Sequence, residues 1–371
     1  MYYLKHFFNP DAVRDNLKPA EGDDGKTDRY NLGYVQNVLP GMPLAELLPI
    51  SAPGPGQEAR FCQDQPILPI GHNAVVDPNN PRRLLARSGG YVFYLNDKIT
   101  VKALLNVPHD VDFKVGNIFF VGDIAVHGSI RSGFIVHGGN VRVSGVVEGA
   151  NVRAHKNLLI EGGVWGGRNS GIVHAGGKMK MDFLDKGEAR GKDNIFINKS
   201  CLFSTVYAGN NLAVQGRLYG GSVAAYASVY AGESLGNKAA IPTVIRMGYD
   251  PLAMRKVVLL GKSIEERAQT IRHLTAIAGH LPPDTNDNTR RLQALKAENA
   301  AAEAEHKEML RKSTSEEGIA ERCRLLCPGT VFPGVEIFIG KSYAKITRQY
   351  ESVQFRLVNG GIKAELLPRK K

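Results

Sequence analysis

The chain has 371 residues, of which 43% are hydrophobic and 22% charged, and its formal net charge is +11. This length and composition are typical of a globular protein with two or three domains. The sequence contains no run of 18 apolar residues that could cross a membrane as a helix. The first residues lack the apolar stretch and cleavage site of a secretory signal, so we expect a soluble, cytoplasmic protein.

Residues 1–115 have the least regular pattern and are expected to form an N-terminal head domain of α+β or mostly β structure. Residues 89–113 contain short segments of strand type, joined by a turn at residues 95–97. Residues 51–57 are rich in proline and glycine, which predicts a linker or a surface loop.

Residues 116–248 contain a repeat. Equivalent positions recur at intervals of 17, 17, 21, 16, 17 and 17 residues, and they are Asp123, Asn140, Asn157, Lys178, Asn194, Asn211 and Ser228. Behind each of them alternate positions are apolar, and glycine recurs five positions later in several copies. A short strand with one apolar face cannot bury that face alone, whereas stacked copies bury a continuous core. The repeat therefore predicts a β-solenoid with coils of about 17 residues.

Three features of the repeat carry more detailed expectations. His137 takes a position that is alanine in other coils, so its side chain should point inward or towards an end of the stack. Residues 165–170 lengthen one coil and should bulge from a corner as a loop. The coil at residues 178–191 follows the repeat least and is expected to be irregular.

Residues 249–312 change to a helical period. One apolar stripe is Leu260, Ile264, Ala268, Ile271, Leu274, Ile277 and Leu281, and a weaker heptad stripe is Leu292, Leu295, Asn299, Ala302, His306 and Met309. The break at residues 281–287 predicts an antiparallel helical hairpin of coiled-coil type, in which polar seam residues help fix the register. Residues 313–371 return to strand patterns and should continue or cap the solenoid.

Candidate catalytic residues are few. Asp182, Asp185 and Glu188 are the acids that could gather as a glycan-cleaving enzyme requires. The other main solenoid acids, at turns or at different phases of the repeat, are Asp123, Glu148, Glu161 and Asp193. The solenoid histidines are His127, His137, His155 and His174, of which at most two share a corner, too few for a metal site. We predict no catalytic, cofactor-binding or metal-binding residue, and no enzyme activity.

The basic residues and the cysteines lead to two further expectations. A basic stripe for nucleic acid or an anionic membrane surface could form if one face carried Arg142, Arg153, Lys156 and Arg168. The cysteines have no framework spacing and are expected to be buried free thiols, as in a reducing compartment: Cys62, Cys201, Cys323 and Cys327.

Four stretches of the sequence resemble the bacterial flagellar assembly protein A (FapA) family. They are residues 38–49 (VLPGMPLAELLP), residues 111–154 with the first repeats, residues 241–251 (IPTVIRMGYDP), and residues 329–366 after the helical hairpin. The resemblance implies a right-handed β-helix with an N-terminal domain. It also implies a non-enzymatic role linked to flagellum assembly, with polar localisation in some members. The sequence departs from many members in lacking their long N-terminal extension, and in the coil at residues 178–191.

These observations predict four segments: a head at residues 1–115, a β-helix at 116–248, a helical hairpin at 249–312, and C-terminal strands at 313–371. The expected function is a non-catalytic scaffold or localisation protein that binds flagellar assembly or polar localisation factors. Exposed coil ends could also favour self-association. The alternatives are a glycan-acting enzyme that uses the acids at residues 182–188, or a protein that binds nucleic acid or a membrane surface.

Overall fold

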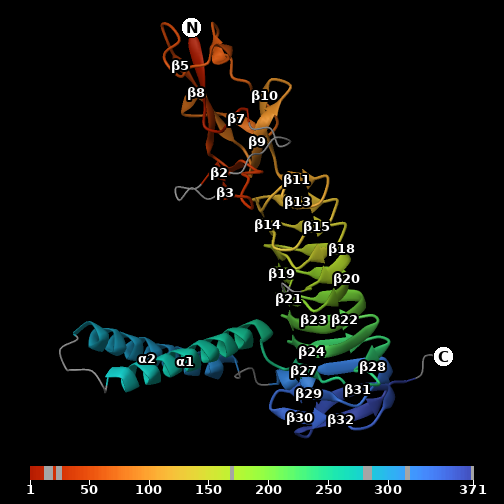
Figure 1. Ribbon diagram of the computed structural model, residues 1–371. Coiled ribbons are helices and arrows are strands. Elements are labelled where there is room, and N and C mark those ends of the chain that lie inside the picture. Colours follow the sequence, from red (N-terminus) through yellow and green to blue (C-terminus); the bar gives the residue numbers. More distant parts are fainter. Residues whose placement is uncertain (12–19, 22–26, 168–170, 279–285, 314–317, 369–371) are drawn as a thin grey trace. The chain divides into compact units, whose positions relative to one another are not determined.

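The computed structural model describes residues 1–11, 20–21, 27–167, 171–278, 286–313 and 318–368 (Figure 1). The chain divides into two compact units. Unit 1 comprises residues 1–191 and 196–200, and unit 2 comprises residues 192–195 and 201–371. The fold is mostly β, with a β-solenoid of about eight turns and coils of about 17 residues, which confirms the predicted fold class. No helix in the described part of the chain is long and apolar enough to cross a membrane.

The head of unit 1 consists of two small antiparallel sheets, with strand orders β6-β1-β5-β8-β7 and β10-β9-β4. Their strands are β1 (Tyr2–His6), β4 (Asn37–Val38), β5 (Pro43–Pro49), β6 (Cys62–Gln63), β7 (Ala74–Asp77), β8 (Asn80–Ala86), β9 (Gly90–Leu95) and β10 (Lys98–Lys102); β2 (Ala20–Glu21) pairs with β3 (Thr27–Asp28). The predicted turn joins β9 to β10 through Asn96 and Asp97, whose φ angles are 50° and 57°. The helical structure among the described residues of the head is one turn of 3-10 helix (Ala59–Phe61), so this part of the head is mostly β, which is one of the two predicted alternatives.

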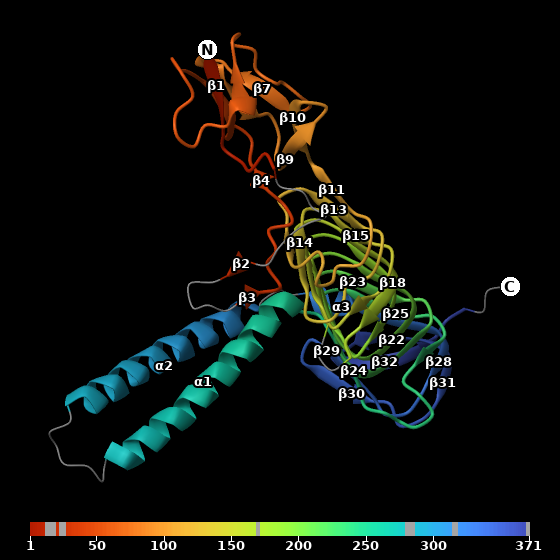
Figure 2. The same cartoon turned by 45° about the horizontal axis from the view of Figure 1, so that its top comes forward.

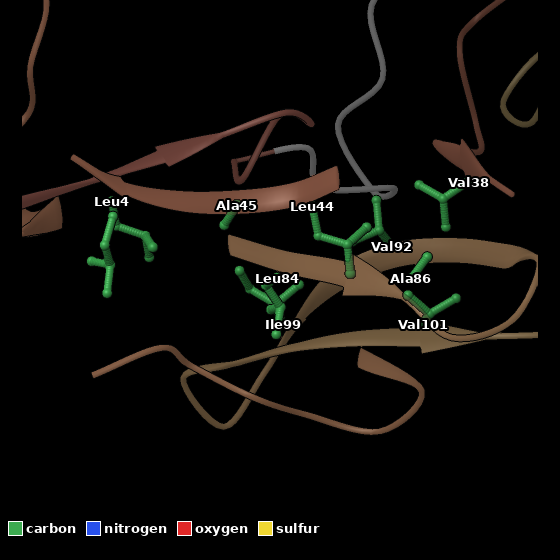
Figure 3. Packing of buried hydrophobic residues seen from close by; sticks show 10 residues of the cluster. Leu4, Val38, Leu44, Ala45, Leu84, Ala86, Val92, Ile99 and Val101 are labelled. Carbon is green, nitrogen blue, oxygen red and sulfur yellow. The ribbon is translucent and has the colours of Figure 1, made fainter. Parts of the chain in front are cut away.

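The core of the head lies between these two sheets. Leu44 and Leu84 from the larger sheet pack towards Ile99 and Val101 from the smaller one, as Figure 3 shows, and none of the four exposes any surface. Burial of an aliphatic side chain of this size contributes about 1.5–3 kcal/mol, so these contacts hold the two sheets together.

The solenoid of unit 1 is a ladder of short parallel strands. They are β11 (Leu104–Val107), β12 (Ile118–Phe119), β13 (Asp123–Val126), β14 (Ile135–Gly138), β15 (Val141–Val143), β16 (Val147–Glu148), β17 (Asn151–Ala154), β18 (Leu158–Trp165), β19 (Ile172–Ala175), β20 (Met179–Asp185) and β21 (Glu188–Gly191). β11 already pairs in parallel with β13. The solenoid therefore begins at Leu104, ahead of the boundary predicted after residue 115, because the first coil lacks the repeat's sequence marks.

The recurring polar residues form a ladder at one corner of the coils. Asp123 Oδ1 accepts the backbone N–H of Asn140 at 2.7 Å, and Asn140 Oδ1 accepts both the backbone N–H and the side-chain N–H of Asn157 at 3.2 Å. In unit 2, Asn194 Oδ1 accepts the same two groups of Asn211, at 3.1 and 2.9 Å. Each amide therefore satisfies the backbone of the next coil where the strand pairing is interrupted.

The recurring glycines allow neighbouring coils to approach closely at a second corner. The N–H of Gly145 donates to the carbonyl of Gly128, and the N–H of Gly162 donates to that of Gly145. A Cβ atom on Gly162 would lie 2.5 Å from the Gly145 oxygen. Glycine is required there because any side chain would push the coils apart.

His137 points outward, between Phe119 and Arg153 of the adjacent coils, so the prediction that it points inward or towards an end of the stack is wrong. In β14 the buried side chain is Val136, which stacks between Ile118 and Val152, whereas His137 is paired with Arg153. The reason is that one residue separates β14 from the next corner amide, while two residues separate β17 from its own corner amide. A shift of one residue along a strand moves every side chain to the opposite face.

The coil at residues 178–191 is regular, contrary to prediction. Met179 and Met181 are fully buried and stack on Leu158 and Ile160 of the preceding coil. The pairing of β20 with β18 is irregular at one point, a bulge between Ile160 and Gly163. Methionine fills core space as valine or leucine does in the other coils, although it is not a typical strand residue. The predicted loop at residues 165–170 lies partly outside the described residues.

Unit 2 continues the same architecture and contains the helices. Its elements are β22 (Ile195–Ala208, of which residues 196–200 belong to unit 1), β23 (Asn211–Val214), β24 (Arg217–Ala225), β25 (Ser228–Ala231), β26 (Ser234–Leu235), β27 (Thr243–Met247), α1 (Pro251–Ala278), α2 (Asn286–Ser313), α3 (Ile319–Arg322), β28 (Arg324–Val331), β29 (Val335–Ile339), β30 (Ser342–Lys345), β31 (Tyr350–Val358) and β32 (Gly361–Leu366). The helices interrupt the solenoid, because β28 pairs in parallel with β25, and β29 with β27. β30 and β31 then pair antiparallel with β29 and β28, so the last strands first continue the solenoid and then cap it.

The helical hairpin is present, and α1 and α2 lie side by side (Figure 2). Along the described α2 side chains, the less exposed positions are those of the predicted stripe: Leu292, Leu295, Asn299, Ala302, His306 and Met309. In α1, Leu260, Ile264, Ala268, Ile271 and Leu274 are half-buried. The side chains of the last two predicted positions lie outside the described residues, and coiled-coil geometry stays a prediction.

Among the described residues of the hairpin seam, one polar side chain is buried and only partly hydrogen-bonded. Asn299 is 7% exposed, and its Nδ2 donates to Glu303 Oε1 at 2.7 Å. Its Oδ1 has no hydrogen-bond partner among the described residues. A buried carbonyl oxygen without a donor costs stability, which fits a residue whose role is to fix the register of the seam.

Candidate functional site

A groove on the outer face of the solenoid is the strongest candidate for a binding surface in unit 1. Its volume is about 580 Å³. It crosses successive coils along the β13-β15-β18-β20 ladder, at the first residues of each strand, next to the polar corner. The ladder places Ala125, Arg142, Leu159 and Lys180 in line, each paired with the next. These residues lie 17 to 21 positions apart in the sequence, so the stacking of coils is what brings them together.

The floor of the groove is apolar and its charged groups are mainly cationic. Leu104 and Phe196 line it with 47% and 41% of their surface exposed, so that two large apolar side chains expose surface in the same groove. Arg142 and Lys180 project beside them. Arg142 forms an ion pair with Glu161, and the Asp123 carboxylate is held by Asn140 within the corner ladder.

The repeat pattern does not predict the apolar residues of this groove. Leu159 and Phe196 occupy outward positions of their strands, where the alternating pattern predicts polar side chains. That departure from alternation is the signal in the sequence. It becomes informative once the strand register shows that the two residues line the same groove.

Two of the acids that could have gathered as a catalytic cluster, Asp182 and Glu188, make separate contacts. The Asp182 carboxylate accepts hydrogen bonds from Lys199 Nζ at 2.6 Å and Asn198 Nδ2 at 2.7 Å, and these, led by Lys199, lower the pKa of Asp182. Glu188 lies on β21, and its Oε1 accepts from Arg190 Nε at 2.6 Å. Within the described residues, no three His, Cys, Asp or Glu side chains are grouped so that they could hold a metal ion.

The basic residues that could have formed a stripe, and the solenoid histidines, are distributed over different strand ladders. Arg142 lies on β15, whereas Arg153 lies on β17 between His137 and His174, in a different ladder. Burial, helped by Arg153, lowers the pKa of His137. His127, His155 and Lys156 lie at exposed positions, and Arg168 falls outside the described residues.

The four cysteines are free thiols, as predicted, although not all are buried. Cys201, Cys323 and Cys327 are buried, and burial raises the pKa of Cys323 and of Cys327 to about 11. Cys62 in the head is only partly buried. Thiols of raised pKa carry little thiolate near neutral pH, so the buried cysteines act as core side chains.

Comparison with known protein families gives one result. The sequence model described as the Flagellar Assembly Protein A beta solenoid domain (FapA) matches residues 103–362. No curated protein and no solved structure matches the chain. The match covers more than half of the sequence, and it begins where the parallel ladder begins, at β11. The chain therefore belongs to the flagellar assembly protein A family.

Proposed function

We propose that this protein is a non-catalytic scaffold in bacterial flagellum assembly and that it binds a protein partner along the groove of unit 1. The family match supports a role related to flagellar assembly. The single observation that carries the binding mode is that exposed Leu104 and Phe196 and half-buried Leu159 line the groove beside Arg142 and Lys180. We propose that the protein lies in the cytoplasm, and that it lies at the cell pole in cells whose flagellum is polar.

The occupant that fits this groove is an extended segment of a flagellar assembly protein with apolar side chains next to acidic ones. Apolar side chains would cover Leu159 and Phe196, where interface burial contributes most of the binding energy. Carboxylates would face Arg142 and Lys180, which favours the correct partner and speeds association more than it strengthens binding. The stacked coils hold the groove rigid, which lowers the entropy lost on binding.

Site-specific photo-crosslinking in the source organism tests this proposal. A photoreactive phenylalanine analogue replaces Leu159, and the matched control carries it at Leu366, which is 77% exposed and lies outside the groove. We expect a single adduct at position 159 that contains a component of the flagellar apparatus and is absent at position 366. Reversal of the two groove charges, Arg142→Glu with Lys180→Glu, should abolish it. An adduct that contains nucleic acid, or that is identical at both positions, would contradict the proposal.

A further inference from the structure

Unit 2 contains a separate cavity of about 520 Å³, a volume within the range of about 300–1,000 Å³ that is typical of small-molecule sites. It lies between the outward faces of β22, β24, β27 and β29 and the first two turns of α1. α1 begins at this point because Pro251 occupies its first position and Asp250 caps it, with Asp250 Oδ1 accepting the N–H groups of Leu252 and Ala253 at 2.9 and 3.2 Å.

An arginine stacked on an aromatic ring forms the floor of the cavity. Strand pairing places Arg246 between Ala224 and Phe338. The guanidinium carbon lies 5.1 Å from the centroid of the Phe338 ring, and Nη1 donates to Ser222 Oγ at 2.9 Å. Ser222 engages one of five guanidinium N–H groups. Ala224, which pairs with Arg246 across the strands, also lines the cavity.

A second cation–aromatic pair and a lysine form the walls. Arg255, in the second turn of α1, lies with its guanidinium carbon 5.7 Å from the centroid of the Tyr207 ring. Lys341 projects from the turn between β29 and β30. Burial raises the pKa of Tyr249 to about 12, so its hydroxyl remains a neutral hydrogen-bond donor at physiological pH.

The charge of this lining is positive. Its charged side chains are Arg246, Arg255 and Lys341, and none of the described residues that line the cavity is acidic. Among the described carboxylates close to the cavity in sequence, Asp250 caps α1 and Glu336 lies 3.8 Å from Lys345. Three cations, from β27, from α1 and from the turn after β29, surround one cavity and favour a ligand with more than one negative charge.

We propose that this cavity binds a nucleoside phosphate. Its base would stack against the rings and guanidinium planes of the two cation–aromatic pairs, since arginine and aromatic side chains both present flat faces to a planar ring. Its phosphate would accept hydrogen bonds from Arg246, Arg255 and Lys341, in the manner by which arginine forks engage phosphate oxygens. The site is independent of the groove in unit 1, so it is a second binding function of the chain.

Isothermal titration calorimetry of the full chain tests this inference, with GMP, AMP, guanosine and inorganic phosphate as probes. We expect at least one nucleotide to bind with one-to-one stoichiometry, and guanosine and phosphate each to bind at least about ten-fold more weakly, because each makes half of the contacts. If inorganic phosphate bound as tightly as GMP and AMP do, the result would contradict stacking of the base in the cavity. No heat with any probe at about 1 mM would overturn the whole inference.

Variants locate the site. Arg246→Ala and Arg255→Ala should each weaken nucleotide binding at least about ten-fold, which corresponds to about 1.4 kcal/mol. Arg255 lies on a helix surface, so its variant tests the site even if Arg246→Ala fails to fold. Arg217→Ala is the matched control, because Arg217 is exposed on β24 outside the cavity. Unchanged affinity in both cavity variants, or an equal loss in the control, would show that the nucleotide binds elsewhere.

Discussion

Neighbouring residues of β14 should respond very differently to truncation. Val136 is completely buried and stacks between coils, so Val136→Ala removes two buried carbon atoms at about 0.8 kcal/mol each and leaves a cavity. The expected loss is about 2–3 kcal/mol in the free energy of unfolding. His137 is partly exposed on the outer face, where its ring meets Phe119 edge-on at 5.2 Å between centroids. His137→Ala should cost about 1 kcal/mol or less, the value of such a ring contact.

Urea unfolding followed by tryptophan fluorescence measures both losses. Trp165 is the one tryptophan of the chain and lies on β18, in the same unit, so its emission reports the solenoid that carries both variants. The comparison depends on the 16-residue offset that pairs Val136 with Val152. A loss in His137→Ala equal to or larger than that in Val136→Ala would refute this register, and with it the outward position of His137.

Three further predictions concern stability. Gly162→Ala should destabilise the solenoid by about 1–3 kcal/mol, because its Cβ would lie 2.5 Å from the Gly145 oxygen. The control variant is Gly54→Ala, whose Cβ would have no neighbour closer than 3.7 Å. Equal losses of stability in thermal melts of the two variants would contradict the close approach of the coils. Asn299→Leu should raise the stability of the helical hairpin by about 1–2 kcal/mol, because it removes a buried oxygen that has no donor among the described residues. A lower melting temperature by circular dichroism would contradict this. The pKa of Asp182 is lowered in the folded state, so its stabilisation is complete above the unfolded value of about 3.9 and is lost as pH falls through the folded value. The difference in melting temperature between wild type and Asp182→Asn should therefore narrow from pH 6 to about pH 3, and a constant difference would contradict the ion pair.

The repeating part of the fold follows from the sequence because strand alternation and stacking leave few alternatives. Val141 and Leu158 recur at one phase of the repeat, and the structure stacks them in one buried column. The seam of α2 is predicted position by position, because a helix with one buried stripe must place it every three or four residues. Even the polar member Asn299 lies where the heptad places it, buried in the seam.

The failures come from features that periodicity does not determine. The number of residues at a corner is set by local backbone geometry, and one residue fewer after β14 turned His137 outward. The groove depends on which outward residues of different coils become neighbours. Leu159 and Phe196 are far apart in the sequence, and only the strand register shows that they line one surface. The cavity of unit 2 likewise combines residues from position 207 to position 341, on both sides of the helical insertion.

The most direct test of the central claim is the number of flagella per cell in the source organism, counted by electron microscopy in a deletion strain that carries single-copy variants. We predict that the deletion loses flagella and that the wild-type gene restores them. Leu159→Glu, which places a charge in the groove, should fail to restore them, whereas Leu366→Glu should succeed, with both proteins at wild-type levels by immunoblot. Normal flagella in the deletion strain, or full restoration by Leu159→Glu, would contradict a scaffold that acts in flagellum assembly through this groove.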